Sequence, residues 1–164
     1  MGPIRPASVA WTYDSRMPIP ELGSEGFLPP GIHDAQLEEV GVAFGRFLRS
    51  DRRVRLFHRF CEYLAELRRL GHAVEVLLDG SFVTSKAEPE DIDMIVVYPR
   101  DFSFGANLVP AEYNMIDRRR VRRVFGFDVA PVTAHSRDLD IWLEYFCQDL
   151  RRRIPNKGLI RVIL

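Results

Sequence analysis

Residues 77–97 read LLDGSFVTSKAEPEDIDMIVV, and this stretch decides the fold that the sequence predicts. It starts at the end of an apolar run, passes through a polar loop that opens with Gly80-Ser81, and finishes in a second apolar run. Apolar runs that are rich in β-branched residues and bounded by turn residues are typical of buried strands. We therefore expect strands over 73–78 and 91–98, joined by the polar loop.

The second apolar run opens with two acidic residues, Asp91 and Asp93. Side chains two positions apart on a strand project from the same face. Two carboxylates held close together repel each other unless a cation lies between them. The pair is therefore a candidate cation site, although a lone Asp-x-Asp sequence is more often a solvated strand start.

The composition predicts one soluble domain. A chain of 164 residues can bury a core without disulfides or bound metal ions to stabilise it. Contents of 46% hydrophobic and 28% charged residues are ordinary for a globular protein. The formal net charge of zero excludes a global field that would draw the chain to nucleic acid. Cys61 and Cys147 lie in apolar helical patterns, as buried thiols in a reducing compartment would. No apolar run reaches the roughly 18 residues of a membrane span, so we expect a cytoplasmic protein with no membrane contact.

The order of the expected elements indicates an α+β (α/β-like) fold. Residues 1–31 form a proline-rich N-terminal arm, which Trp11, Tyr13 and Phe27 could hold against the domain at 32–164. Helical periodicity and capping residues, with Asp34 as the first N-cap, predict helices over 35–47, 51–70, 110–124 and 137–151. Short apolar runs predict further strands over 127–132 and 159–164. Helices that alternate with strands predict a sheet packed by helices.

Asp128 is the most informative residue outside the opening stretch. It lies between Phe127 and Val129 in an apolar run, where an isolated buried carboxylate would be costly. A hydrogen-bond network, an arginine or a metal ion must compensate such a charge. If this strand lies beside the strand of Asp91 and Asp93, three carboxylates converge.

These parts together resemble the nucleotidyltransferase superfamily, which has the DNA polymerase β-like fold. The matching segments are Leu77-Leu78-Asp79-Gly80-Ser81, Asp91-Ile92-Asp93 and Phe127-Asp128-Val129. More closely, GSFVTSKAEPEDIDMIV, FLPPGIHDAQLEEV and KGLIRVIL are similar to an uncharacterised family of small bacterial proteins of this superfamily, over residues 27–164. The resemblance implies a nucleotidyltransferase fold, with a small mixed β-sheet flanked by helices.

The resemblance also implies a site. Asp91, Asp93 and Asp128 would be the catalytic residues and would hold two divalent ions, Mg²⁺ or Mn²⁺. The residues that would bind the nucleoside triphosphate, ATP for example, are Gly80, Ser81, Thr84 and Lys86. The related minimal antitoxins usually place small residues and an arginine after Gly-Ser, whereas this chain has Phe82-Val83-Thr84-Ser85-Lys86. This difference leaves the phosphate contacts and the acceptor open.

Arginines cluster in the expected third helix and after the fourth. They are Arg118, Arg119, Arg120, Arg122 and Arg123, followed by Arg151, Arg152 and Arg153. Such clusters are typical of a solvated helix face, and they can also contact a phosphate backbone such as that of tRNA. The candidate nucleic-acid contacts are Arg118, Arg119, Arg122 and Arg123.

Three functions follow from these patterns. The first is metal-dependent transfer of a nucleoside monophosphate to a hydroxyl on RNA, such as tRNA, or on a protein. The resemblance places such enzymes in toxin–antitoxin or phage-defence pairs, and therefore implies a cognate toxin or antitoxin as partner. The second is a non-catalytic antitoxin or binding module with the same fold. The third is an RNA-binding protein that uses the arginine-rich helix.

Overall fold

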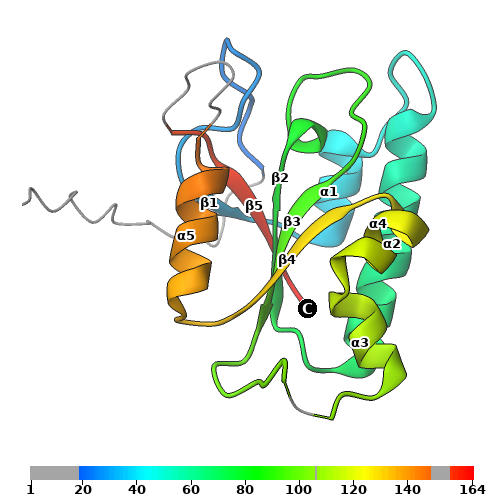
Figure 1. The fold of residues 1–164 in the computed structure, drawn as a ribbon. Helices are drawn as coiled ribbons and strands as arrows, with labels where there is room; N and C mark the ends of the chain where they lie inside the picture. Colours follow the sequence, from blue (N-terminus) through cyan, green and yellow to red (C-terminus); the bar gives the residue numbers. More distant parts are fainter. Residues whose placement is uncertain (1–18, 106, 149–155) are drawn as a thin grey trace, which may run out of the picture.

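A computed structural model describes residues 19–105, 107–148 and 156–164, and it has the expected α+β fold with a mixed sheet (Figure 1). The strands are β1 (Ile32–Asp34), β2 (Glu75–Asp79), β3 (Asp93–Tyr98), β4 (Asp128–Thr133) and β5 (Leu159–Ile163). The helices are α1 (Leu37–Phe44), α2 (Arg52–Leu70), α3 (Pro110–Ile116), α4 (Arg118–Phe125) and α5 (Arg137–Phe146). One 3₁₀ turn, η1 (Ser81–Val83), follows β2.

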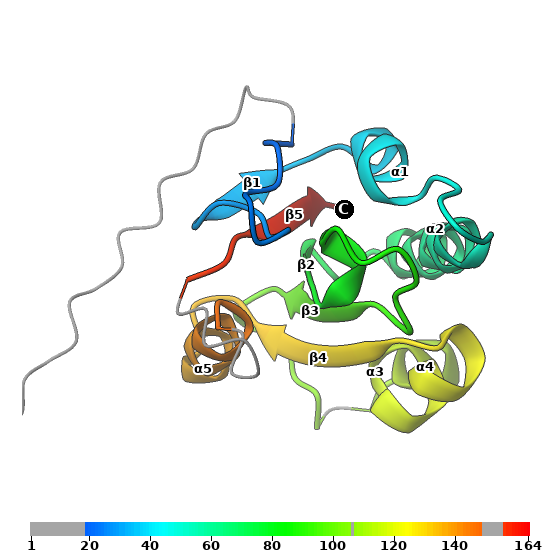
Figure 2. The same ribbon diagram turned by 90° about the horizontal axis from the view of Figure 1, so that it is seen from above.

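The strands form a single sheet in the order β1-β5-β2-β3-β4. β2 runs antiparallel to both β5 and β3, whereas β1 runs parallel to β5 and β4 runs parallel to β3. Parallel neighbours need a crossover connection, and α3 and α4 supply it between β3 and β4 (Figure 2). The crossover brings the first residues of β3 and β4 side by side at one end of the sheet.

Helices cover both faces of the sheet, but unequally (Figure 2). On one face Phe60 and Tyr63 of α2 belong to the larger core together with Val76 and Leu78 of β2. On the other face Phe146 of α5 packs in a smaller core. The central strands β2 and β3 are buried at every position but their first, as their continuous apolar sequences predict.

The first predicted helix is shorter than expected, and a strand precedes it. Asp34 was predicted to cap this helix, but it ends β1 and accepts hydrogen bonds of 2.6 and 2.9 Å from the Arg161 guanidinium of β5. The helix begins at Leu37, after Gln36. The prediction was wrong here because a strand of three residues carries no hydrophobic period.

The third predicted helix is divided at Asp117. This residue ends α3 in an extended conformation, and its Oδ1 atom accepts a hydrogen bond of 2.7 Å from the Arg120 amide, which caps α4. The arginine cluster therefore lies on a separate short helix. A side chain that can cap the next helix competes with helix continuation, so the single helix over 110–124 was a wrong prediction.

Several predicted features lie outside the described ranges or near their ends. Trp11, Tyr13 and Arg151 to Arg153 are outside them, as are the last residues of the predicted helix over 137–151. Leu28, within the predicted arm, is buried in the larger core. Cys147 is buried as expected, whereas Cys61 is only partly buried. Among the described helices none combines the length and the apolar character needed to cross a membrane.

Candidate functional site

Strand pairing sets the positions of the acidic residues. Asp93 is the first residue of β3 and lies opposite Asp128, the first residue of β4, and opposite Asp79, the last residue of β2. The Asp128 amide also donates a hydrogen bond of 3.1 Å to the carbonyl of Ile92. Asp91 was expected within the strand, but it precedes β3. The sheet therefore gathers acidic side chains from three neighbouring strands at one end.

The three predicted carboxylates converge. One oxygen each of Asp91, Asp93 and Asp128 lie within 4.8 Å of one another. Divalent ions bind oxygen ligands at about 2.0–2.6 Å, depending on the ion, so two oxygens bound to one ion lie at most about 4–5 Å apart. The donor set and its spacing therefore fit a hard divalent cation.

Asp128 differs from the expectation in its burial. It was predicted to be a buried carboxylate inside an apolar strand, but its side chain is 50% exposed. The residue begins β4, and the buried positions are its neighbours Phe127 and Val129. An apolar run identifies a strand but places its ends only to within a few residues, which explains the error.

Arg122 of α4 bridges two of the acids. Its Nη1 atom donates hydrogen bonds of 2.6 Å to Oδ2 of Asp91 and 2.8 Å to Oδ2 of Asp128. The hydrogen bond that Arg122 donates to Asp91 and the charges of the nearby carboxylates raise the pKa of the guanidinium. Arg122 was predicted as a nucleic-acid contact, but in the structure its guanidinium provides positive charge to the carboxylate cluster.

Asp93, the first residue of β3, lies among more carboxylates than cations. Burial, followed by the charges of Asp91, Asp79 and Asp128, raises its pKa from 3.8 to about 7, although Lys157 opposes the shift. At this pKa the carboxyl is mostly protonated below about pH 7, unless further positive charge approaches. A bound cation would reverse the shift, since an ion is the largest charge in such a site.

Gly80 lies directly against Asp93. Its φ angle of 77° belongs to a region that favours glycine. A Cβ atom at this position would lie 1.9 Å from Oδ2 of Asp93, so no other residue fits without moving the carboxylate. The glycine of the predicted phosphate loop is therefore needed to seat an acid of the cluster.

A buried arginine that the sequence did not single out holds the loop after Gly80. Arg53 of α2 is 2% exposed, and its guanidinium donates to the carbonyls of Phe82 and Thr84, both at 2.7 Å. It also donates to the carbonyl of Lys86. The Thr84 hydroxyl donates to the carbonyl of Ser81 at 2.8 Å, which closes the turn. Arg53 was not predicted as a buried residue because its sequence neighbours Arg52 and Arg55 are typical of a solvated helix face.

The loop and the acids line one cavity of about 720 Å³, within the range of small-molecule sites. Every predicted catalytic and nucleotide-binding residue contributes to its lining, namely Gly80, Ser81, Thr84, Lys86, Asp91, Asp93 and Asp128. Phe27, from the predicted arm, also lines it. The sequence therefore predicted a set of residues that the fold places around a single space.

Lys157 is a second residue that the sequence argument missed. Its Nζ atom lies 2.5 Å from Oδ1 of Asp79, and both side chains are more than nine-tenths buried at the wall of the cavity. The residue opens the segment KGLIRVIL, which carried part of the resemblance. A lysine beside an apolar run was the available signal, because a buried lysine needs a partner charge.

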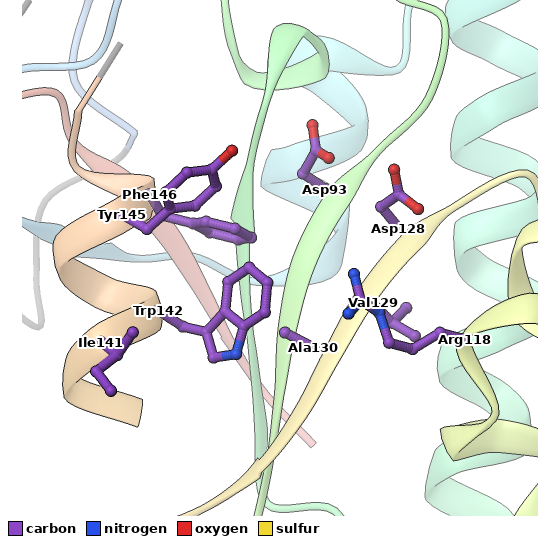
Figure 3. A pocket seen from close by; sticks show the side chains of 9 residues that line it. All are labelled: Asp93, Arg118, Asp128, Val129, Ala130, Ile141, Trp142, Tyr145 and Phe146. Carbon is purple, nitrogen blue, oxygen red and sulfur yellow. The ribbon is translucent and has the colours of Figure 1, made fainter. Parts of the chain in front are cut away.

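A second cavity, of about 320 Å³, adjoins the first (Figure 3). Trp142, Tyr145 and Phe146 of α5 line one side of it, and Arg118 of α4 lies on the other. The Arg118 guanidinium carbon is 5.6 Å from the centre of the Trp142 ring, a cation–π distance. The other two candidate nucleic-acid contacts, Arg119 and Arg123, are exposed.

Comparison with known families gives one match, which covers residues 20–163. The chain belongs to the family of unknown function DUF6932. The DUF6932 match takes in the last part of the predicted N-terminal arm as well as the whole described sheet. No curated protein and no solved structure matches the chain.

Proposed function

We propose that this protein is a metal-dependent nucleotidyltransferase that moves a nucleoside monophosphate from a nucleoside triphosphate to a hydroxyl. The observation that carries the proposal is the convergence of Asp91, Asp93 and Asp128, with oxygens within 4.8 Å of one another, on a cavity of about 720 Å³. The Gly80-Ser81 turn lines the same cavity. Carboxylates at the start of neighbouring strands beside a glycine turn suit chemistry on a triphosphate.

Asp91, Asp93 and Asp128 would hold Mg²⁺ or Mn²⁺. Bound there, a divalent cation would neutralise phosphate charge and lower the pKa of the attacking hydroxyl. Arg122 now bonds to two of the three ligands, so its guanidinium has to withdraw when a cation binds. Its side chain is 50% exposed, which leaves room for that movement.

The charges at this end of the sheet constrain the number of ions. The carboxylates of Asp79, Asp91, Asp93 and Asp128 face the cations Lys157 and Arg122. Four negative charges against two positive ones leave two negative charges, which one divalent ion balances. Withdrawal of Arg122 leaves three negative charges, still fewer than the four positive charges of two divalent ions. The two ions implied by the resemblance are therefore balanced only when the triphosphate adds its own charge.

The residues of the chain have distinct roles in the proposed reaction. The exposed Lys86 and the Gly80-Ser81 turn bind and orient the triphosphate along the larger cavity. The acceptor oxygen forms a bond to the α-phosphorus, and the bond from that phosphorus to the bridging oxygen of the β-phosphate breaks. Pyrophosphate leaves with the electron pair, and the hydroxyl proton passes through the carboxylate cluster to water.

Labelled nucleoside triphosphates test the proposal. The protein is incubated with each of the four, with Mg²⁺ or Mn²⁺, and with tRNA or cell lysate that contains candidate protein acceptors and partners. We expect label transfer with pyrophosphate release in wild type, and loss of both in Asp91→Asn, Asp93→Asn and Asp128→Asn. Asp101→Asn, at an exposed acid outside the cluster, is the matched control. The absence of transfer under every condition would sink the proposal.

A second function, a non-catalytic antitoxin or binding module, is favoured by one observation. Arg122 already compensates Asp91 and Asp128, as expected for a site that works without a metal ion. Thermal stability with triphosphate and Mg²⁺ separates the two functions. If the site is active, triphosphate and Mg²⁺ raise the melting temperature of wild type, and Asp93→Asn abolishes this rise. If the protein is a non-catalytic module, the melting temperature shows no metal-dependent rise.

A further inference from the structure

The smaller cavity is built differently from the larger one. Its lining is mostly apolar and aromatic, with Val129 and Ala130 of β4 between the two helices. The aromatic side is Trp142, Tyr145 and Phe146, and the Trp142 ring packs edge-on against both of the others, with centres 5.8 and 5.7 Å apart. This aromatic cluster gives one side of the cavity a fixed face for a flat ring.

The two cavities meet at the acids. Asp93 and Asp128 line both, as do Tyr145 and Phe146. A ligand in the smaller cavity, between α4 and α5, therefore reaches two of the carboxylates that line the larger cavity. If the triphosphate occupies the larger cavity, the smaller one is in position to present the attacking hydroxyl.

The basic residue of the smaller cavity, Arg118, selects among hydroxyl compounds. Arg118 and Arg122 are four residues apart on α4, so they share one face of the helix. Arg122 is committed to the carboxylates, whereas Arg118 lines the smaller cavity beside Trp142. A ligand that suits the cavity has a flat ring that can pack against Trp142 and an anionic group that can bind Arg118. It also has a hydroxyl that can lie near Asp128.

We propose that the smaller cavity binds the acceptor, and that the acceptor is a nucleotide unit with a free ribose hydroxyl, its base against Trp142 and its phosphate on Arg118. This inference rests on the proposed function. In that reaction the ribose oxygen replaces pyrophosphate on the α-phosphorus, and the hydroxyl proton leaves to water. The cavity volume of about 320 Å³ lies in the range of sites that bind small ligands. A free nucleotide and the last nucleotide of an RNA strand present the same chemistry.

Tryptophan fluorescence tests this inference without relying on catalysis. The chain has two tryptophans, so Trp11→Phe leaves Trp142 as the sole reporter. The ligands are the four nucleoside monophosphates, a short RNA ending in a 3′-hydroxyl and N-acetyltyrosinamide, in metal-free buffer. We expect saturable quenching by the monophosphates, the RNA or both, since a stacked base quenches indole emission. Binding by the RNA alone identifies a strand end, and binding by the monophosphates identifies a free nucleotide.

Matched variants connect the signal to the cavity. Arg118→Ala should weaken binding roughly tenfold, the effect of losing a hydrogen bond to a charged group. Arg100→Ala, at an exposed arginine that lines neither cavity, should not change it. Tyr145→Ala should weaken binding, whereas Tyr113→Ala, at an equally exposed tyrosine on α3, should not.

Three results would overturn the inference. They are absence of quenching by every nucleotide, quenching by N-acetyltyrosinamide alone, and quenching by nucleotides that Arg118→Ala leaves unchanged. Failure of the proposed function gives a different pattern. In that case nucleotides still quench Trp142, but no label is transferred from any triphosphate.

Discussion

The Nη1 atom of Arg122 lies 2.6 Å from Oδ2 of Asp91, although the two residues are 31 positions apart in the sequence. The same nitrogen lies 2.8 Å from Asp128. A single guanidinium therefore bonds to two of the three acids that would hold a metal ion. Arg122 and a divalent cation are competitors for one group of oxygens.

Removing the Arg122 charge should strengthen cation binding. For Arg122→Gln we expect Mn²⁺ affinity to rise roughly tenfold, because a hydrogen bond between charged groups is worth about 1.5–3 kcal/mol and no longer has to be broken. Titration of Mn²⁺ by electron paramagnetic resonance measures the change. Arg123→Gln, one residue along the same helix and exposed, is the control. Weaker Mn²⁺ binding in Arg122→Gln would mean that the arginine supports the site.

Asp93 should make the metal-free protein less stable as pH rises. Its pKa is about 7 in the folded protein, whereas the ordinary value is 3.8. Between these two pH values the folded state therefore holds a proton that the unfolded state has lost. Stability then decreases as pH rises from about 4 to about 7, by on the order of 3 kcal/mol. Asp93→Asn lacks this decrease.

Chemical denaturation of wild type and Asp93→Asn across this pH range, with a chelator present, measures the effect. We expect the variant to be the more stable protein at pH 8, and the advantage to shrink toward pH 4. Saturating Mg²⁺ should reduce the difference by stabilising wild type alone. Parallel pH profiles for the two proteins would contradict the raised pKa.

Gly80→Ala should damage both the fold and the site. A Cβ atom there would lie 1.9 Å from the Asp93 carboxylate, in addition to the strain of a positive φ. Gly71→Ala is a matched control, because Gly71 has a φ of 72° but nothing within 4 Å of its Cβ position. Left-handed backbone costs a non-glycine residue about 1–2 kcal/mol. We expect Gly71→Ala to lose about that much unfolding free energy, and Gly80→Ala to lose more and to bind Mn²⁺ more weakly.

Arg53→Met should release the loop after Gly80. The guanidinium is buried and bonds to several loop carbonyls, and each buried acceptor left without a donor costs about 1–3 kcal/mol. We expect a loss of more than about 3 kcal/mol in urea unfolding. Arg55→Met, two residues away with a side chain that is 64% exposed, should change stability by less than about 1 kcal/mol. Equal effects of the two substitutions would show that the carbonyl contacts contribute little.

The sequence predicted the parts of the fold that have a strong local pattern. The apolar runs predicted β2 to β5 to within two residues. The three residues of β1 were missed because their strand forms only by pairing with β5. Asp117 divides the third helix because its side chain caps α4, a local competition that helical periodicity does not express.

The acidic residues of the site could be predicted from the sequence, but its basic residues could not. Asp91, Asp93 and Asp128 follow from residue type and position, and they converge as expected. Arg122 and Lys157 acquire their roles from partners far along the chain, and one sequence does not say which charges meet in space. The metal, the triphosphate and the acceptor remain predictions, for which the fold supplies two adjoining cavities.

The position of β5 has a consequence for the biosynthesis of the protein. This strand lies between β1 and β2, so residues 159–163 pair with strands that begin at Ile32 and Glu75. The sheet stays in two parts until these residues have left the ribosome, and contacts between distant segments form slowly. A nascent chain that stops before Leu159 exposes the edges of β1 and β2 and is prone to aggregate. Synthesis of β5 therefore decides when the described sheet can close.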